Sequence, residues 1–460
     1  MGISSDFLNQ STFIEIESTF DFIRQVYPGQ YLPSIPELER YPDPNNVCNY
    51  LTKEEFRDIP KWQSQWVHWE KQCGAIIEGN YFDLTPIHFE GIFTLICNLR
   101  CPHCTQQNDR RILDTWQLNA IPNEHNTLSL SQLFLVIDQI THFKNKDPLG
   151  IVWGGGDPTC NPDTYAAMLY AKSKNILSSF ITNGVLLDVE KLLEIEPVLV
   201  RVSLNCGTAN TYNKFHGLSK GNKSFFRTIS NIEEFGRKKR LYQSKTLLGV
   251  SLVVDERNID DSVVACKLLS SINAKCENAI DYVIIRPAMQ YSFFKDNVVN
   301  LNDNTKIKYL NTIHEKLKQV LDSANIPIIT IKDSFQNPPD DSFYDNTDCL
   351  AYGLFSQVRC NGDIQLCSDS YGDNKYTIGN LLNESIADIW KSERRKNVLN
   401  EINKVKCYKK SCPFNSRGHH HNRIFHQIEL FRKKGKMKEV VQWIESLKQT
   451  TLPLNHSFFI

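Results

Sequence analysis

Hydrophobic and polar positions follow two alternating patterns from about residue 87 onward. Short apolar runs typical of buried strands alternate with longer segments in which apolar residues recur every three or four positions, the helical period. The runs lie at about 88–96, 149–153, 177–182, 198–205, 247–254 and 281–286. Because strands that alternate with helices are typical of parallel βα units, the pattern predicts an α/β fold with six such units.

One predicted helix carries its own start signal. Ser129 and Gln132 match a capping box, and the apolar series Leu133, Ile137 and Ile140 follows. The pattern predicts a helix that begins after Ser129 and buries this apolar face.

The first 85 residues do not follow this alternation. They are rich in aromatic residues and prolines, and Trp62, Trp66 and Trp69 are spaced as on one face of a helix. A tryptophan stripe of this kind is typical of a packed core. The segment is therefore predicted to be a mostly helical N-terminal extension.

Composition narrows the class of protein. The 460 residues are enough for two or three domains, and 52 Lys and Arg balance 52 Asp and Glu, which leaves no electrostatic footprint for nucleic acid. The sequence has no signal-peptide pattern and no apolar run near the length of a membrane span. We therefore predict a cytoplasmic protein whose 14 cysteines are metal ligands and core residues, not disulfides.

Three cysteines form the most informative cluster in the sequence. Cys97, Cys101 and Cys104 are separated by three and two residues, and no fourth cysteine lies close by. Three thiolates can bind three irons of a four-iron cluster and leave the fourth iron open. The alternative is a zinc site, which would want a fourth ligand at comparable spacing, whereas His103 lies inside the two-residue loop and cannot easily point the same way.

A glycine-rich turn follows the second predicted strand. It reads Gly154, Gly155, Gly156, Asp157 and Pro158, and glycines let a backbone approach a ligand closely. Together with the three cysteines, this turn resembles the GGEP motif of the radical S-adenosylmethionine enzymes, with Asp in place of the more usual Glu. The resemblance implies that the turn holds the amino group of S-adenosylmethionine.

The same resemblance implies a fold, a reaction and further site residues. The fold is a partial (βα)6 barrel of the TIM type, with the cysteines and the glycine turn on the rim at the carboxyl ends of the strands. A reduced cluster would cleave S-adenosylmethionine to a 5′-deoxyadenosyl radical that abstracts hydrogen from a substrate, with flavodoxin or ferredoxin as electron donor. The further cofactor-binding residues implied at strand ends are Asn183, Ser203 and Asn205, each with an ordinary role as a turn or strand-end polar group as its alternative. Arg286, at the end of the sixth strand, is a further candidate to pair with a carboxylate of the substrate or cofactor, with a structural ion pair as its alternative role.

A second set of cysteines lies near the C-terminus. Cys349, Cys367, Cys407 and Cys412, with Gly362 between the first two, resemble the SPASM/twitch auxiliary domain. Four ligands suffice for one fully ligated 4Fe–4S cluster, so the shorter twitch version is predicted, and the chain would hold two clusters in all. A structural four-cysteine zinc site is the alternative.

Cys360 is separated from this set by a predicted hairpin. Asn361 and Gly362 are a strong two-residue turn signal, which places Cys360 opposite Asp363 and on the order of 13 Å from Cys367, too far to share a cluster. Cys360 is either a buried small hydrophobe or a catalytic thiol that donates a hydrogen atom to a substrate radical. The other cysteines are predicted to be weaker donor candidates near the rim (Cys160, Cys206) or packing residues (Cys48, Cys73, Cys266, Cys276).

These elements divide the chain into four parts. The predicted domains are an N-terminal extension over 1–85, the barrel over 86–325, the auxiliary domain over 326–415 and a helical tail over 416–460. In this tail His419, His420 and His421 are predicted at a polar surface or in a phosphate-like contact, and not as metal ligands. The extension leaves room for recognition of a leader peptide, although it reads as helical.

The predicted function is modification of a ribosomally synthesised peptide by epimerisation, crosslinking or oxidation. A small-molecule dehydrogenase or epimerase of natural-product biosynthesis is the alternative. An alternative of another class is a non-enzymatic zinc or iron–sulfur scaffold.

Overall fold

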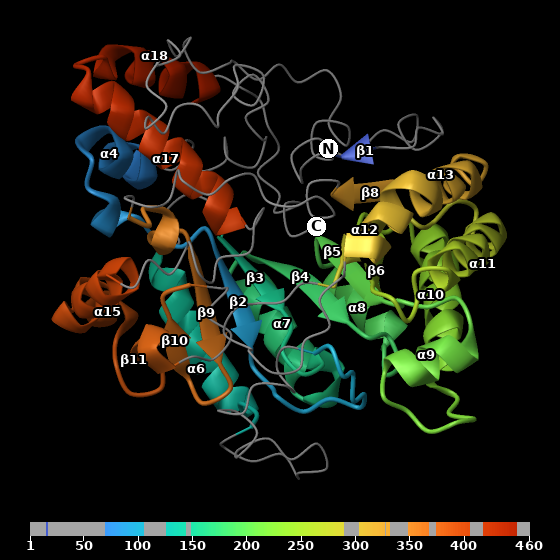
Figure 1. The fold of residues 1–460 in the computed structure, drawn as a ribbon. Helices are drawn as coiled ribbons and strands as arrows, with labels where there is room; N and C mark the ends of the chain where they lie inside the picture. The colour runs from blue at the N-terminus through green and yellow to red at the C-terminus, as the bar shows by residue number, and fades with distance from the viewer. Residues whose placement is uncertain are drawn as a thin grey trace.

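The computed structural model describes residues 15–16, 70–104, 126–143, 149–288, 303–326, 328–331, 348–367, 374–404 and 417–448. The tryptophan stripe at residues 62–69, Cys48, Cys407 and Cys412 lie outside the described residues. A single eleven-stranded sheet runs through the described part in the order β1-β8-β7-β6-β5-β4-β3-β2-β9-β10-β11 (Figure 1).

The six predicted strands are present and form the centre of this sheet. They are β2 (His88–Ile92), β3 (Leu149–Trp153), β4 (Ile176–Thr182), β5 (Leu199–Ser203), β6 (Leu247–Val254) and β7 (Tyr282–Pro287). Each pairs in parallel with the next strand along the chain. The predicted α/β fold with a partial barrel is therefore confirmed.

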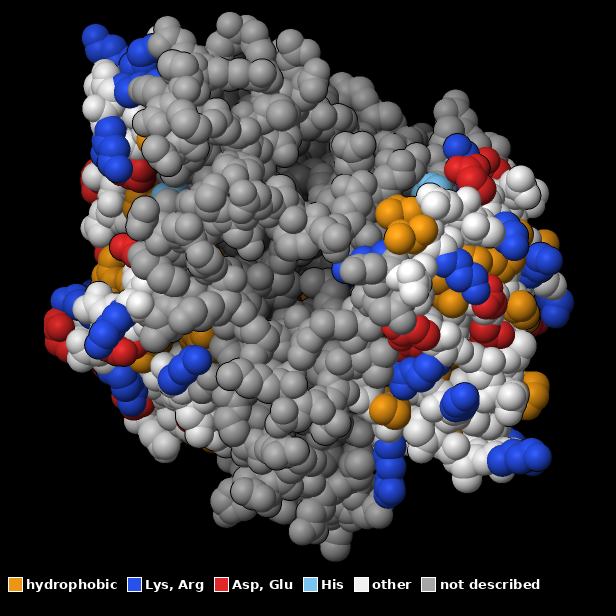
Figure 2. Space-filling model, in the orientation of Figure 1, with side chains coloured by type: hydrophobic (Ala, Val, Ile, Leu, Met, Phe, Trp, Pro, Cys, Tyr) orange, Lys and Arg blue, Asp and Glu red, His pale blue; other side chains and the backbone are white. Residues whose placement is uncertain are grey.

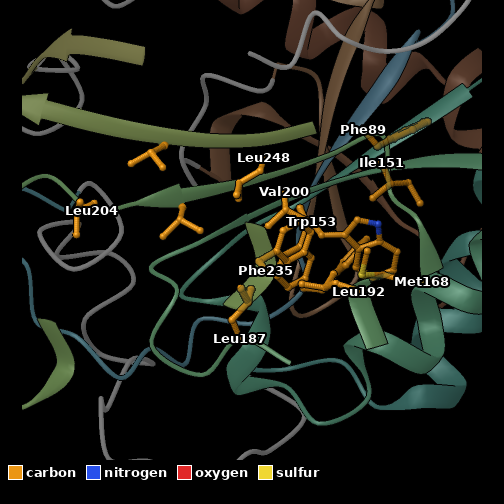
Figure 3. Packing of buried hydrophobic residues seen from close by; sticks show 14 of the residues in the cluster. Phe89, Ile151, Trp153, Met168, Leu187, Leu192, Val200, Leu204, Phe235 and Leu248 are labelled. Carbon is orange, nitrogen blue, oxygen red and sulfur yellow. The ribbon is translucent and has the colours of Figure 1, made fainter. Parts of the chain in front are cut away.

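Helices follow the first five of these strands and cover one face of the sheet. They are α6 (Leu130–Ile140), α7 (Thr164–Ser173), α8 (Val189–Ile195), α9 (Ala209–Phe215), α10 (Ser224–Leu241) and α11 (Asp261–Lys275), with short helices η3 (Thr141–Phe143) and η4 (Pro158–Cys160). The predicted capping box is present at α6, where the Ser129 backbone nitrogen donates to Gln132 Oε1 at 2.9 Å. Figure 3 shows the resulting core, in which Trp153, Phe89 and Val200 of the strands pack beside Met168 and Leu192 of the helices.

The sheet extends beyond the six barrel strands on both sides. Helices α12 (Asp303–Lys308) and α13 (His314–Asp322), joined through η5 (Tyr309–Ile313), lead to β8 (Ile328–Ile331), which pairs with β7 and with β1 (Glu15–Ile16). On the other side β9 (Phe355–Arg359) pairs in parallel with β2, and β10 (Asp363–Gln365) and β11 (Thr377–Asn380) continue antiparallel. The predicted boundary between the barrel and the auxiliary domain, at residue 325, thus lies just before β8, a strand that joins the same sheet as the barrel strands.

The auxiliary region is tied to the barrel by a buried arginine. Helices α14 (Ile386–Lys391) and α15 (Glu393–Lys404) follow β11, and η8 (Ala351–Gly353) and η10 (Asn374–Tyr376) flank its strands. The Arg395 guanidinium lies 3.9 Å from the Trp390 ring centroid and 4.2 Å from that of Phe82, and it donates to the Phe82 carbonyl at 2.9 Å. This stacked guanidinium, whose Nη1 also donates to the Trp390 carbonyl at 2.7 Å, fixes α15 against η2 (Tyr81–Asp83).

Helices from the two ends of the described chain pack together on the other face of the strands. They are α4 (Glu70–Glu78), α17 (Arg417–Lys433) and α18 (Met437–Lys448), which lie side by side at the upper left of Figure 1. Their apolar residues, among them Phe425 and Trp443, share a core with Val152 and Leu199 of the strands. His421 is fully buried there, which contradicts the polar surface predicted for it, because α17 turns this side chain toward Phe355.

On the face drawn in Figure 2, the described residues show no dominance of one charge. In Figure 2, Lys and Arg side chains are interspersed with Asp and Glu on the part of this face that the structure describes. This mixture agrees with the balanced composition. Among the described helices, none is long and apolar enough to cross a membrane.

Candidate functional site

The three clustered cysteines lie in the loop that leaves the carboxyl end of β2. Cys97, Cys101 and Cys104 are all half-buried, and the Cys104 backbone nitrogen donates to the Cys101 carbonyl at 3.0 Å, which closes a tight turn. Burial raises the pKa of the Cys97 thiol, and the negative charges of Asp157 and the other two cysteines raise it further. The three thiols are therefore close enough to influence one another.

Polar groups with nitrogen atoms surround two of these thiols. Cys97 Sγ accepts from the Leu99 backbone nitrogen at 3.4 Å and from Asn183 Nδ2 at 3.7 Å, and Cys101 Sγ lies 2.9 Å from His216 Nδ1. Donors to ligating sulfurs are typical of iron–sulfur sites, where they orient the ligands and tune the metal. The residues of this loop therefore fit a cluster bound by thiolates.

The cysteine loop is not built as a mononuclear metal site. Within the residues that the structure describes, no three His, Cys, Asp or Glu side chains are placed to hold a metal ion. That arrangement concerns ligands around one ion, as in zinc sites. A four-iron cluster instead holds each cysteine on a separate iron.

The glycine turn after β3 packs directly on the cysteine loop. Gly156 N donates to the Thr94 carbonyl and Asp157 N to the Ile96 carbonyl, both at 2.8 Å. A Cβ on Gly155, which has φ +113°, would lie 2.3 Å from Thr94 O, and a Cβ on Gly156 would lie 2.3 Å from Ile96 O. These two glycines are thus required by the neighbouring backbone.

Gly154 differs from the other two glycines. A Cβ placed on it would meet nothing within 4 Å. The sequence predicted that the glycines let a ligand come close to the backbone, and this prediction fits Gly154. At Gly155 and Gly156 the segment that comes close is Thr94–Ile96 of the protein itself. Pro158, the first residue of η4, is buried.

The Asp157 carboxylate joins the ends of β3 and β4. It is fully buried and accepts from the Thr159 backbone nitrogen at 3.0 Å, Thr182 Oγ1 at 3.0 Å and the Asn183 backbone nitrogen at 2.7 Å. Burial raises the pKa of this carboxyl, and these hydrogen bonds oppose the rise. Its side chain therefore positions the turn, and the contacts open to a ligand come from the backbone.

The predicted strand-end residues fall into two groups. Asn183 Nδ2 donates to Asn98 Oδ1 at 2.7 Å inside the cysteine loop, and buried Asn205, with φ +63°, accepts from the Val253 backbone nitrogen at 2.9 Å. Both side chains therefore hold backbone segments in place. Half-buried Ser203 on β5, whose hydroxyl accepts from Ser251 Oγ at 3.2 Å, keeps a hydrogen to donate.

Arg286 lies on the face of the sheet opposite the six helices. It is half-buried, and its β6 neighbour in register is Val253. Burial raises the pKa of Tyr282 to about 12, and the positive charges of Arg201 and Arg286 oppose that rise. The two arginines therefore lie near the Tyr282 hydroxyl. The Tyr282 ring packs on Gly249, where a Cβ would lie 2.3 Å from that hydroxyl.

Cys360 lies beside the cysteine loop. It is buried in a small cluster with Ile92 and Leu95, against which Cys97 also packs, because β9 runs parallel to β2. The hairpin differs from the predicted two-residue turn: Gly362 N donates to the Arg359 carbonyl at 2.9 Å, and Gly362 has φ +85°. Cys360 thus lies within the turn itself, one position before the predicted tip, and does not face Asp363.

The remaining cysteines are placed as follows. Cys349 and Cys367 are half-buried, and Cys349 N donates to Asn403 Oδ1 of α15 at 2.9 Å; their predicted partners lie outside the described residues. Half-buried Cys160 has its sulfur 3.9 Å from Asn98 Oδ1, and Cys206 is fully buried. The packing role predicted for Cys73, Cys266 and Cys276 is confirmed by their burial.

Several residues around the cysteine loop were not found from the sequence. Arg257 forms an ion pair with buried Asp255, lies 4.7 Å from the Phe215 ring centroid and contacts His103 Nδ1 at 3.3 Å. Burial and Arg257 lower the pKa of His103 to about 3, and burial, His103 and Arg257 lower that of His216 to about 3. His103 is part of the cysteine loop, whereas Phe215, His216, Asp255 and Arg257 belong to no motif, so only the fold brings them to the loop.

Two family models match the chain. Residues 92–261 match the Radical SAM superfamily, and residues 349–413 match the SPASM iron-sulfur cluster-binding domain. The first match contains the cysteine loop and the glycine turn. The second contains the C-terminal cysteines.

Curated relatives are similar over part of the chain. The Fe-coproporphyrin III synthase of Methanosarcina barkeri (strain Fusaro / DSM 804) is 30% identical over 168 residues, which are 36% of this chain and 36% of that protein. The mycofactocin maturase MftC of Mycobacterium tuberculosis (strain ATCC 25618 / H37Rv) is 27% identical over 177 residues, 38% of this chain and 39% of that protein. The chain thus spans well under half the length of the curated relatives it matches.

Solved structures show the same fold. SuiB of Streptococcus suis bound to S-adenosylmethionine has a TM-score of 0.50 at 15% identity, over 71% of both chains. SuiB bound to its precursor peptide SuiA has a TM-score of 0.51 at 14% identity, over 78% of this chain and 75% of that one. At such identities the likeness is one of fold.

Proposed function

Because this chain belongs to the radical S-adenosylmethionine superfamily and carries a SPASM iron–sulfur cluster-binding domain, we propose that it modifies a peptide by radical chemistry. A four-iron cluster with one open iron, when bound, supplies the electron that cleaves S-adenosylmethionine to the radical that removes a substrate hydrogen. The observation that carries this proposal is the hydrogen-bonded packing of the glycine turn on the cysteine loop.

The residues of the rim have distinct roles in this proposal. Cys97, Cys101 and Cys104 hold the open cluster. The Gly154 backbone, with free space beside it, binds the amino group of S-adenosylmethionine. The Asp157 carboxylate holds the turn in place by its hydrogen bond from the Asn183 backbone nitrogen. The polar side chains proposed to contact the bound molecules are Ser203 and Arg286, while Asn183 and Asn205 position the loops around them.

A second, fully ligated cluster is proposed for the auxiliary domain, as in the twitch version of the domain. Its ligands would be Cys349, Cys367, Cys407 and Cys412, and a flavodoxin or ferredoxin would supply electrons to the protein. Such a cluster has no open iron for a second S-adenosylmethionine. Its proposed role in oxidation or crosslinking is to accept the electron of the substrate radical, or else to hold the substrate pocket in shape, whereas epimerisation would need a hydrogen donor in place of an electron acceptor. Anaerobic iron and sulfide analysis should find about eight irons per chain; zinc at one or two per chain would instead support the scaffold alternative.

The proposal of a peptide substrate draws on the proteins to which the chain is similar. One relative is named a maturase of mycofactocin, and one solved structure of the same fold contains a precursor peptide. The 30% identity to a synthase named for Fe-coproporphyrin III keeps a small-molecule substrate as the second candidate. Both candidates use the same rim residues.

Incubation with a peptide separates the two candidates. Under anaerobic conditions with reductant and S-adenosylmethionine, the short peptide encoded beside the gene should increase 5′-deoxyadenosine formation and should itself change in mass or, in deuterated water, take up label. Mass spectrometry of both products makes the measurement, with the Cys101→Ala protein as control. If 5′-deoxyadenosine forms while the peptide stays unchanged, the peptide proposal is wrong.

Cys360 is the proposed hydrogen-atom donor. It is 3% exposed beside Cys97, and burial raises the pKa of its thiol to about 11, so it keeps its hydrogen at neutral pH. In an epimerising enzyme, Cys360→Ala should still form 5′-deoxyadenosine, while epimerised product falls by at least ~10-fold, which is ~1.4 kcal/mol in barrier. Label uptake and chiral amino-acid analysis make the measurement.

A matched control separates this role from packing. Cys276 is also buried, but in the barrel core beside α10, so Cys276→Ala should leave the product unchanged. Equal product from the Cys360→Ala and wild-type proteins would remove Cys360 from the reaction and leave it a packing residue.

A further inference from the structure

We propose that His216 is a positioning residue for the cluster loop, and that its Nδ1–H donates a hydrogen bond to Cys101 that raises the reduction potential of the cluster bound there. The inference rests on the proposed function, because it requires Cys101 as a cluster ligand. Reduction adds negative charge to the cluster and its thiolates. A donor to a ligating sulfur stabilises that charge, and so it favours the reduced form.

The contact itself is short, and its histidine side is buried. His216 Nδ1 lies 2.9 Å from Cys101 Sγ, and the side chain is 1% exposed. A ligating thiolate only accepts hydrogen bonds, so this contact places the imidazole proton on Nδ1. Because the imidazole is buried, the hydrogen bond acts in a lower local dielectric than at a surface, where its electrostatic effect is larger.

The fold holds the imidazole ring in place from its own helix. His216 is the residue that ends α9, and its ring centroid lies 4.2 Å from that of Tyr212 and 5.4 Å from that of Phe215, both of the same helix. Tyr212 is itself buried and anchored by its hydroxyl, 3.3 Å from Thr228 Oγ1 of α10. The ring therefore has little freedom to turn away from the sulfur.

The cysteine loop is docked on the same point by its backbone. Arg100 N donates to the His216 carbonyl at 3.1 Å. A Cβ on Gly217, which has φ +65°, would lie 2.2 Å from Arg100 O. The backbone of Arg100, the residue before Cys101, is thus held against the backbone of His216 and Gly217. This backbone packing brings the His216 side chain to Cys101.

This donor differs from those around Cys97. The two donors to Cys97 Sγ lie at 3.4 Å and 3.7 Å, and one of them is a backbone nitrogen of the loop itself. His216 comes from a helix 115 residues away and makes a shorter contact. It is therefore a side-chain donor that substitution can remove without altering the loop's own sequence.

The test measures a potential, so it does not depend on turnover. In His216→Phe, the equilibrium constant for reduction of the cluster should fall about 10-fold. This corresponds to a midpoint potential lower by ~59 mV for one electron. His216→Asn places an amide nitrogen near the Nδ1 position and should restore most of the potential. The measurement is an EPR-monitored redox titration of the full chain, following the reduced signal that S-adenosylmethionine alters.

Two further variants make the outcome decisive. His216→Gln carries the amide one bond farther out, so its potential should be as low as that of His216→Phe. If the phenylalanine variant loses iron, the comparison of His216→Asn with His216→Gln still tests the inference. Equal potentials in His216→Gln and His216→Asn, or a wild-type potential in iron-replete His216→Phe, would overturn the inference. Cys101→Ala should lose about four irons; full iron retention there would instead refute the ligand assignment of the proposed function.

Discussion

Replacing Cys101 with alanine should abolish the formation of 5′-deoxyadenosine from S-adenosylmethionine, with a loss of at least ~1,000-fold, or ~4 kcal/mol in barrier. The reason is that a cluster with an open iron needs three thiolates, and two leave it unanchored. Iron should fall from about eight to about four per chain, since the auxiliary cysteines are untouched. Chromatography of the nucleoside products and iron analysis of anaerobically reconstituted protein make the measurement.

Cys266 is the matched control for this change. It is also fully buried, but in the barrel core and outside the cysteine loop. Cys266→Ala should therefore keep both the iron content and 5′-deoxyadenosine formation, with only a modest loss of stability. If Cys101→Ala retained activity, or if both variants lost it equally, the assignment of the open cluster to this loop would be wrong.

Replacing Gly156 with alanine should disrupt the same site without removing a ligand. Its Cβ would lie 2.3 Å from Ile96 O and 2.6 Å from Leu95 C, backbone atoms that move only with the cysteine loop. We expect the free energy of unfolding to fall by ~2 kcal/mol or more, the range of an overpacked core. The iron content of the open cluster should fall as well, because the loop must shift; urea unfolding and iron analysis make the measurement.

Gly154→Ala is the contrasting substitution in the same turn. Its Cβ would meet nothing within 4 Å, so stability and iron content should stay near wild type. If the space beside Gly154 receives S-adenosylmethionine, the affinity for this cofactor should nevertheless fall, as measured by titration calorimetry. Equal losses of iron in both variants would contradict the separate roles assigned to the two glycines.

The sequence predicted the secondary structure and the main ligand loop well. The six barrel strands and the α6 capping box follow from local periodicity and from residues three positions apart. The neighbourhood of the cysteine loop and the glycine turn was also predictable, because each follows a strand and the carboxyl ends of parallel strands share one edge. These features depend on nearby residues or on a general rule of parallel sheets.

The glycine turn shows where prediction from the sequence reached its limit. The motif indicates a close backbone approach at each of its three glycines, but it does not identify what approaches. In the structure Gly155 and Gly156 face the Thr94–Ile96 segment, and only Gly154 faces open space. A Cβ collides with protein backbone and with ligand for the same steric reason, so the sequence alone does not distinguish the two.

The set of helices and strands and the chemistry of the cysteines follow from the sequence alone, because periodicity and ligand spacing are local properties. Which of these residues come into contact depends on the tertiary fold. His216 reaches Cys101 across 115 residues, and β9 brings Cys360 to Cys97 by pairing with β2. Contacts of this kind depend on how whole strands and helices pack. A histidine or cysteine between apolar residues has the same neighbours in the sequence whether its side chain contacts a ligand thiol or the hydrophobic core.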